Sequence, residues 1–237
     1  MTVFQRQQKI LEFLNEKHFS TVKELAGHVW SSESSVRRDI KALEAKGYIS
    51  QIYGGVVLAE YENSVAPVVL RDSSNSAVKE ELAKMATEHI FDGATIIMDG
   101  SSTVRRIIKH IAPFRNLKII SNNLRVFSEC ENPDTRVYCT GGLFLKQSNI
   151  FVGSGAEKYI SGINADILFF SSQAISEDGV ISDSSEEETA LRRIMMSRAK
   201  KKIYLCDSSK LCTQKTFVIC TKDDVDHIIC NKKLPWE

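Results

Sequence analysis

Hydroxyl and guanidinium groups are concentrated between residues 31 and 41, in a segment predicted to be helical. Its apolar positions Val36, Ile40 and Leu43 recur at i, i+4 and i+7, so the polar side chains project from the rest of the helix. Arginine binds guanine or phosphate, and serine hydroxyls donate hydrogen bonds to phosphate oxygens. This chemistry suits contact with DNA, and the candidate residues are Ser32, Ser34, Ser35, Arg37, Arg38 and Lys41.

A second set of polar residues recurs at the ends of predicted strands. Ligands of parallel α/β sheets bind beyond the carboxyl ends of the strands. Glycine and hydroxyl residues that enter a helix there offer amides and hydroxyls to an anion, and a lysine adds positive charge. One such loop is most often an ordinary turn, but four of them at one sheet edge predict a phosphate site. Its candidates are Asp99, Gly100, Ser101, Ser102, Thr103, Ser121, Asn122, Asn123, Gly141, Gly142 and Lys210.

The helices and strands expected around the candidate DNA contacts form a winged helix-turn-helix over residues 1–58. Thr21 and Glu24 have the spacing of a capping box, and Ser31 and Ser32 interrupt the apolar pattern before the second helix. Gly47 is expected to end that helix. An earlier helix presents Arg6, Ile10, Phe13 and Leu14, and a strand over residues 48–53 turns at Gly54 and Gly55 into residues 56–58. Thr21, Tyr53, Gly54 and Gly55 therefore join the candidate DNA contacts.

The rest of the chain is expected to be a second domain. Polar residues and Pro67 over residues 59–75 predict a linker, and residues 76–237 alternate helical and strand-like patterns. The nearly continuous apolar strands predict a Rossmann-like α/β domain with a mainly parallel sheet. Helices are predicted near residues 77–91, 103–111, 124–130, 155–161 and 185–199, and strands over 94–99, 117–121, 136–140, 166–171 and 202–207.

Charge and cysteine usage set weaker limits. The net charge is +1 for the chain, and the eight basic and six acidic side chains of residues 1–58 leave only +2 there. DNA binding would depend on where the charges lie and on a dimer that doubles the contacts. The six cysteines form no C-x-x-C pair, which disfavours a metal site or a disulfide framework and predicts reduced core cysteines. Without a signal peptide or a long apolar run, a soluble cytoplasmic protein is expected.

These motifs resemble the DeoR family of bacterial transcriptional regulators. Residues 3–58 are similar to its DNA-binding domain through Arg6, Ile10 and Leu14, the run from Ser32 to Ile40, and the glycine wing. Residues 76–232 resemble its sensor domain, which is similar in fold to ribose phosphate isomerase. The resemblance implies a repressor of a sugar or polyol operon that binds a double-stranded operator and a phosphorylated sugar or polyol. A homo-oligomer, dimeric or tetrameric, is also expected, because one short recognition helix reads only a few base pairs. No cofactor, metal or catalytic residue is expected.

Two acidic positions, Asp183 and Glu188, allow more than one interpretation. Glu188 and Arg192 form an i, i+4 pair, for which a solvated, salt-bridged helix face is the favoured interpretation. The resemblance nevertheless places a carboxylate near the sugar, so Glu188 and Asp183 are included as effector contacts. The alternative function is a sugar-phosphate isomerase with an attached DNA-binding domain, for which Asp99 and Asp183 are candidate bases. It is disfavoured because residues 171–175 carry no acid.

Overall fold

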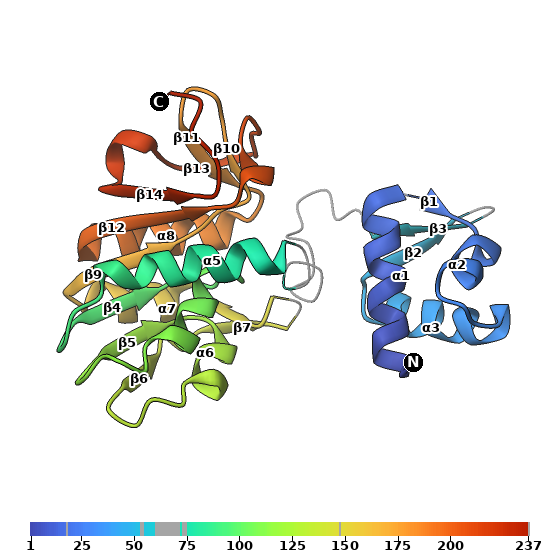
Figure 1. Cartoon of the computed structure of the whole chain (residues 1–237), viewed down its shortest axis with the longest axis horizontal. Helices are drawn as coiled ribbons and strands as arrows, with labels where there is room; N and C mark the ends of the chain where they lie inside the picture. The colour runs from blue at the N-terminus through green and yellow to red at the C-terminus, as the bar shows by residue number, and fades with distance from the viewer. Residues whose placement is uncertain (18, 53–54, 60–71, 73–74, 147, 237) are drawn as a thin grey trace. The chain divides into compact units, whose positions relative to one another are not determined.

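The chain folds into two units, Met1–Arg71 and Asp72–Glu237 (Figure 1). The computed structural model describes residues 1–17, 19–52, 55–59, 72, 75–146 and 148–236. The predicted linker over residues 59–75 lies mostly outside these residues, as do the candidate DNA contacts Tyr53 and Gly54.

Three helices and a small antiparallel sheet form the first unit. The order is α1 (Val3–Lys17), β1 (Phe19–Ser20), α2 (Val22–His28), α3 (Glu33–Ala45), β2 (Ile49–Ile52) and β3 (Gly55–Leu58). β3 lies between β1 and β2, and Ile49 pairs with Leu58 in the β2–β3 hairpin. The two-residue strand β1 was not predicted; the remaining elements confirm a winged helix-turn-helix.

Local signals set the ends of these helices as expected. The Thr21 hydroxyl accepts a hydrogen bond from the Glu24 amide while the Glu24 carboxylate accepts from the Thr21 amide, which completes the capping box. Ser32 caps α3 through the Ser35 amide. Gly47 has a φ of 72°, the left-handed conformation that ends a helix most easily at glycine.

The second unit contains a six-stranded parallel sheet, confirming the predicted fold class. Its strand order is β14-β12-β9-β4-β5-β6, and every pair of neighbours is parallel. The strands are β4 (Thr95–Met98), β5 (Lys118–Ser121), β6 (Arg136–Cys139), β9 (Ala165–Phe170), β12 (Ala199–Cys206) and β14 (His227–Cys230).

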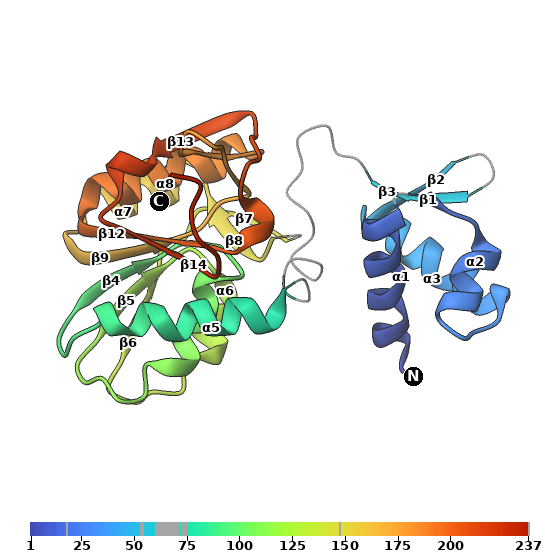
Figure 2. The same cartoon turned by 45° about the horizontal axis from the view of Figure 1, so that its top comes forward.

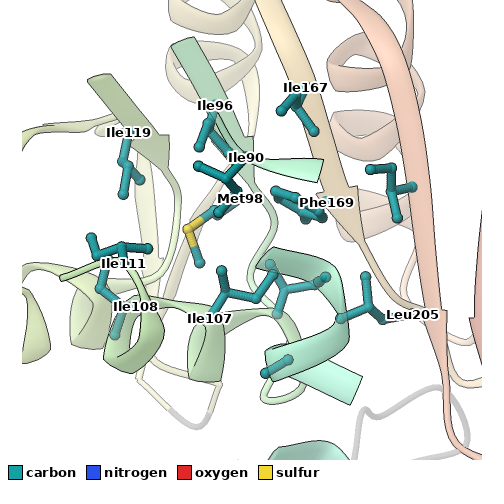
Figure 3. Packing of buried hydrophobic residues seen from close by; sticks show 14 of the residues in the cluster. Ile90, Ile96, Met98, Ile107, Ile108, Ile111, Ile119, Ile167, Phe169 and Leu205 are labelled. Atoms are coloured by element: carbon teal, nitrogen blue, oxygen red, sulfur yellow. The ribbon is translucent and has the colours of Figure 1, made fainter. Parts of the chain in front are cut away.

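Helices cover both faces of this sheet (Figure 2). On one face lie α5 (Ser76–Ala86), the 3₁₀ helix η2 (Val104–His110) and α6 (Leu124–Glu129); on the other lie α7 (Ser154–Ser161) and α8 (Glu186–Arg198). Successive strand residues serve opposite faces, so Ile167 and Phe169 join one core while Leu168 and Phe170 join the other. Figure 3 shows the first of these cores, in which Met98 and Phe169 pack against Ile107.

Several short elements escaped prediction. A hairpin pairs β7 (Leu143–Leu145) with β8 (Ile150–Val152), and a second small sheet contains β10 (Ala174–Ile175), β11 (Val180–Asp183) and β13 (Phe217–Thr221). The edge strand β14 was also missed. The helix predicted near residues 103–111 is the 3₁₀ helix η2, and the one near 77–91 is α5 followed by the 3₁₀ helix η1 (Thr87–His89). Strands this short have little periodicity and depend on their tertiary partners. The chain's remaining 3₁₀ segments are η3 (Ser208–Lys210) and η4 (Lys222–Asp224).

All six cysteines are free, as the sequence predicted, but only some lie in the core. Cys206 and Cys220 are buried, whereas Cys139 and Cys212 are exposed. The prediction of a core position is therefore wrong for Cys139, which lies on the edge strand β6, and for Cys212, which lies in the loop after Lys210. Within the described residues, no helix is long and apolar enough to cross a membrane. No cluster of three or more His, Cys, Asp or Glu side chains suited to a metal was found among them either.

Candidate functional site

The second helix of the helix-turn-helix, α3, presents the predicted polar surface. Val36, Asp39, Ile40 and Leu43 are its buried residues, and they face the core of the first unit. The Arg37 side chain is 62% exposed and pairs loosely with Glu33 at 3.6 Å, an exposed i, i+4 contact that DNA could displace at little cost. Five of the candidate DNA contacts are exposed and Ser35 is half-buried; the exposed residues are Ser32, Ser34, Arg37, Arg38 and Lys41.

The hydroxyl groups at the start of α3 form a small network. The Ser32 Oγ lies 3.0 Å from the Oγ of both Ser34 and Ser35, and an Arg38 guanidinium nitrogen lies 3.4 Å from the Ser35 Oγ. These bonds orient polar groups toward one end of the helix. The Thr21 hydroxyl is engaged in its capping box, and Gly55 is the first residue of β3, the second strand of the wing hairpin.

A buried ion pair that the sequence did not reveal holds α3 against α1. Asp39 is 2% exposed and accepts hydrogen bonds from the Arg6 guanidinium and from the Gln7 amide, the latter at 3.3 Å. The partners are 33 residues apart, and only the charged types at an otherwise apolar helix face hinted at the pair. The pair adds a polar contact to the apolar residues Val36, Ile40 and Leu43, which pack the same helix into the core.

In the second unit, the predicted polar residues lie at the carboxyl ends of β12, β4, β5 and β6. All four strands belong to the parallel sheet, in which β9 separates β12 from β4 and is itself followed by Ser171 and Ser172. The loop after β4 is closed by its own bonds: the Asp99 Oδ1 accepts from the Ser101 amide at 3.0 Å, and the Ser101 Oγ accepts from the Val104 amide at 3.2 Å. This loop is packed and is not a solvent-exposed turn, because all of its residues from Gly100 to Thr103 are buried.

The residues after β5 form hydrogen bonds that hold the loop after β4 in place. The Asn123 side chain donates to the Gly100 carbonyl at 3.0 Å and caps α6 through the Arg125 amide, and the Ser121 hydroxyl donates to the Met98 carbonyl. Asn122 differs, because its Oδ1 is buried without a hydrogen-bond partner among the described residues. A buried acceptor of this kind is suited to a ligand hydroxyl.

The two glycines after β6 have unequal roles. A Cβ on Gly142 would lie 2.5 Å from the Val152 carbonyl oxygen, and its φ is 107°, so this glycine is required for close backbone packing. Gly141 has a φ of 65°, with no atom within 4 Å of a Cβ built there. The structure accounts for Gly142 without a ligand.

Lys210 lies at the end of β12, as predicted, and is joined there by Lys79, which the sequence did not single out. The Lys210 Nζ donates to the Ser171 Oγ at 2.8 Å and lies 3.8 Å from the Asp207 carboxylate. The Lys79 Nζ, in the first turn of α5, lies 3.3 Å from the Ser102 Oγ. Burial lowers the pKa of Lys79 to about 8, and repulsion by the Lys210 charge acts in the same direction. The Lys79 ammonium therefore contacts the hydroxyl loop directly, while the Lys210 ammonium is near enough to repel it and contacts Ser171, at the end of the neighbouring strand β9.

The favoured interpretation of the Glu188–Arg192 pair is wrong. Arg192 is 4% exposed, and its guanidinium binds three carboxylates: Asp99 at 2.8 Å, Asp183 at 2.9 Å and Glu188 at 2.8 Å. The i, i+4 spacing describes only one of these contacts, because the tertiary fold turns this side of α8 onto the end of β4 and onto β11. The three predicted acidic effector residues thus share one buried arginine.

Asp72, the only described residue between 60 and 74, is anchored to the second unit. Its carboxylate accepts hydrogen bonds from the Arg105 and Arg125 guanidiniums, and its carbonyl accepts from Arg106 at 2.8 Å. Arg105 and Arg106 lie on η2, which directly follows the loop from Asp99 to Thr103. The residue that begins the second unit is therefore tied to the helix that leaves the hydroxyl loop.

Comparisons with known proteins assign the two units. Residues 6–62 match the DeoR-like helix-turn-helix domain, and residues 74–232 match the DeoR C terminal sensor domain. The chain belongs to the DeoR family. It is similar to the HTH-type transcriptional regulator GolR of Listeria innocua, with 32% identity over 99% of this chain and 92% of that protein. It is also similar to the transcriptional repressor AccR of Agrobacterium fabrum, with 29% identity over 94% of this chain and 88% of that protein.

Solved structures resemble the fold of this DeoR-family chain at low identity. The tetrameric eIF2B-beta2-delta2 complex from C. thermophilum matches with a TM-score of 0.50 and 12% identity, covering 68% of this chain and 57% of that chain. The ribose 5-phosphate isomerase from Plasmodium falciparum matches with a TM-score of 0.42 and 16% identity, covering 58% of this chain and 53% of that chain.

The DeoR-family chain is a DNA-binding transcriptional regulator, and its curated relatives are regulators, not enzymes. The site agrees with this assignment. Both oxygens of Asp99 accept hydrogen bonds, from Ser101, Ser171 and Arg192, and those of Asp183 are engaged in the same way. Both carboxylates are held in place by Arg192 and by backbone amides, so neither isomerase candidate is arranged to remove a proton from carbon.

Proposed function

We propose that this regulator represses an operon for sugar or polyol metabolism and is released from DNA by a phosphorylated sugar bound in its second unit. The supporting observation is that two lysines meet hydroxyl groups at one edge of the sheet, Lys79 at Ser102 and Lys210 at Ser171, and that the two charges are near enough to repel each other. Two ammonium groups beside hydroxyl donors match a dianionic phosphate. The relatives support the regulatory half of the proposal, since one of them is named a transcriptional repressor. Such a regulator would work in the cytoplasm.

In this proposal the phosphate and the sugar occupy different parts of the strand edge. The phosphate contacts the loop from Gly100 to Thr103 and the two lysines, where the charge is positive. The sugar hydroxyls are directed toward acceptors: the unpartnered Asn122 Oδ1 and the carboxylates of Asp99, Asp183 and Glu188. In this proposal, a structural change in the effector site alters DNA binding through Asp72. This residue is hydrogen-bonded to η2 and is the first residue of the second unit.

The effector half is tested by calorimetry with a panel of phosphorylated sugars and their dephosphorylated counterparts. The wild-type protein should bind one phosphorylated compound, and Lys210→Ala should lose about 1.5 to 3 kcal/mol of that affinity, since a charge-assisted hydrogen bond is removed. Lys210→Ala should still bind DNA, because the DNA contacts lie in the first unit. Equal affinities for both members of every sugar pair, in wild type and variant, would contradict a phosphate site.

For the DNA half, we predict that Arg37→Ala or Arg38→Ala weakens operator binding by roughly 1 to 3 kcal/mol if the side chain reads a base. Both arginines lie in the half of α3 from which helix-turn-helix proteins reach base edges. A phosphate contact would instead weaken all sequences alike. The measurement is a gel shift on a duplex selected by the wild-type protein, and the matched control is Lys158→Ala, an exposed lysine of the second unit. If both variants shift the duplex as the wild-type protein does, these arginines of α3 do not contribute to DNA binding and the assignment of α3 as the recognition helix is wrong.

A homo-oligomer, dimeric or tetrameric, completes the proposal. One short recognition helix reads only a few base pairs, so two copies are needed for a specific operator. Their half-sites should lie about 34 to 36 Å apart, one turn of DNA, or a multiple of it. Light scattering of the free and DNA-bound protein measures this, and a monomer in both states would contradict it.

A further inference from the structure

Trp30 has a backbone conformation that its side chain disfavours. It lies in the turn between α2 and α3 with a φ of 49°, in the left-handed region where residues with a Cβ are uncommon. The Ser31 amide donates to the Ala26 carbonyl at 3.1 Å and the Trp30 amide donates to the Gly27 carbonyl at 3.3 Å. This pair of bonds is the Schellman arrangement, with Trp30 at the position where glycine is preferred.

Packing does not explain the choice of tryptophan here. The residue is 92% exposed, so the indole contributes almost nothing to the core of the first unit, although a large apolar ring is left in water. Its neighbours on both sides serve the fold: Val29 is buried, and Ser32 caps α3. Strained residues persist where function requires them.

The turn occupied by Trp30 lies next to the proposed DNA-reading end of α3. In a helix-turn-helix the second helix enters the major groove by its N-terminal residues, while the first helix crosses the DNA backbone. The turn that joins them therefore meets the sugar-phosphate strand at the border of the groove. Trp30 is two residues before Ser32, whose hydroxyl belongs to the exposed polar network that also contains Ser34.

We propose that Trp30 is a DNA-contacting residue, whose indole ring packs on deoxyribose at the border of the groove that α3 enters. The indole face supplies apolar contact to the sugar carbons, and its Nε1–H can donate to a phosphate oxygen. The contact is made to the backbone, so it is independent of base sequence. It rests on the membership of this chain in a DNA-binding family and does not depend on a phosphorylated effector.

Fluorescence of the full chain can test this contact directly. The chain has two tryptophans, so Trp236→Phe leaves Trp30 as the only indole. The probe is a mixed-sequence duplex about three helical turns long at low salt, where backbone contacts dominate binding. Saturating duplex should change the emission of Trp30 and reduce its quenching by acrylamide several-fold. Unchanged emission and quenching at saturation would overturn the proposal.

Substitutions separate the ring from the backbone conformation. Trp30→Gly and Trp30→Asn both suit a left-handed residue, so neither should lower the melting temperature of the chain. Both should weaken binding to the duplex roughly fivefold, a loss of about 1 kcal/mol, while Trp30→Phe, which keeps a ring, should retain most of the affinity. Wild-type affinity in both ring-free variants would overturn the proposal. So would a loss of Trp30 quenching with rising protein concentration in the absence of DNA, because a second copy would then cover the ring.

Discussion

Arg192→Met is expected to destabilise the second unit by about 3 to 5 kcal/mol, the usual cost of removing one partner from a buried ion cluster. The guanidinium is the shared partner of three carboxylates, each with a side chain no more than 3% exposed. Without it, Asp99, Asp183 and Glu188 would be buried together as like charges. Methionine has a similar length and retains the packing of α8, so the decrease in the free energy of unfolding reports mainly the missing positive charge.

Urea unfolding followed by circular dichroism measures the effect. Arg193→Met is the matched control, because Arg193 is the next residue of the same helix and is exposed, with a hydrogen bond to the Val218 carbonyl; its change should be within about 1.5 kcal/mol. Adding Asp183→Asn to Arg192→Met should recover part of the loss, since one of the stranded charges is removed. If Arg192→Met and Arg193→Met unfold at the same urea concentration, Arg192 does not hold the strand ends together.

Replacing both Lys79 and Lys210 with glutamine is expected to weaken binding of the phosphorylated effector by about 3 to 6 kcal/mol, because two charge-assisted bonds are lost. The two lysines come from distant parts of the chain, α5 and η3, and contact different hydroxyls, those of Ser102 and Ser171. Loss of one lysine should therefore not be compensated by the other. Calorimetry with the compound selected by the wild-type protein gives the magnitude, and Lys84→Gln, an exposed lysine of the same helix α5, is the control.

Lys79 should also give effector binding a characteristic pH dependence. Burial first, and then the nearby Lys210 and Arg106 charges, lower the pKa of Lys79 to about 8, against the opposite effect of Asp207 and Asp72. The free protein therefore loses the Lys79 charge as the pH rises through about 8, and a dianion that requires it must bind together with a proton. Affinity should fall by up to about tenfold per pH unit above this value.

Lys79→Gln should abolish most of this fall, whereas Lys84→Gln should keep it. A wild-type affinity that stays constant between pH 7 and pH 9.5, two values chosen to bracket the pKa of about 8, would show that Lys79 does not contribute its charge to the effector. If the affinity stays constant with pH but Lys210→Ala still weakens effector binding, the phosphate contacts Lys210 and not Lys79.

Features that depend on neighbours in the chain followed from the sequence. The capping box at Thr21, the cap at Ser32 and the left-handed Gly47 each involve residues within five positions, and the structure has all three. The winged helix-turn-helix could be predicted from them. The parallel sheet followed from apolar strands that alternate with helical patterns, because strands buried on both faces are apolar throughout.

Residues brought together from distant parts of the chain could not be predicted. Asp99 and Arg192 are 93 residues apart, and the i, i+4 spacing of Glu188 and Arg192 favoured a solvated face because it says nothing of what covers the helix. Lys79 looked like any polar residue of an amphipathic helix until the fold placed it beside Ser102, 23 residues away. The sequence by itself determined the elements and the edge of the sheet where polar groups gather, since both depend on local pattern and strand direction. Only the tertiary structure decided which charges meet there, because burial and ion pairing are set by the side chains that other elements contribute.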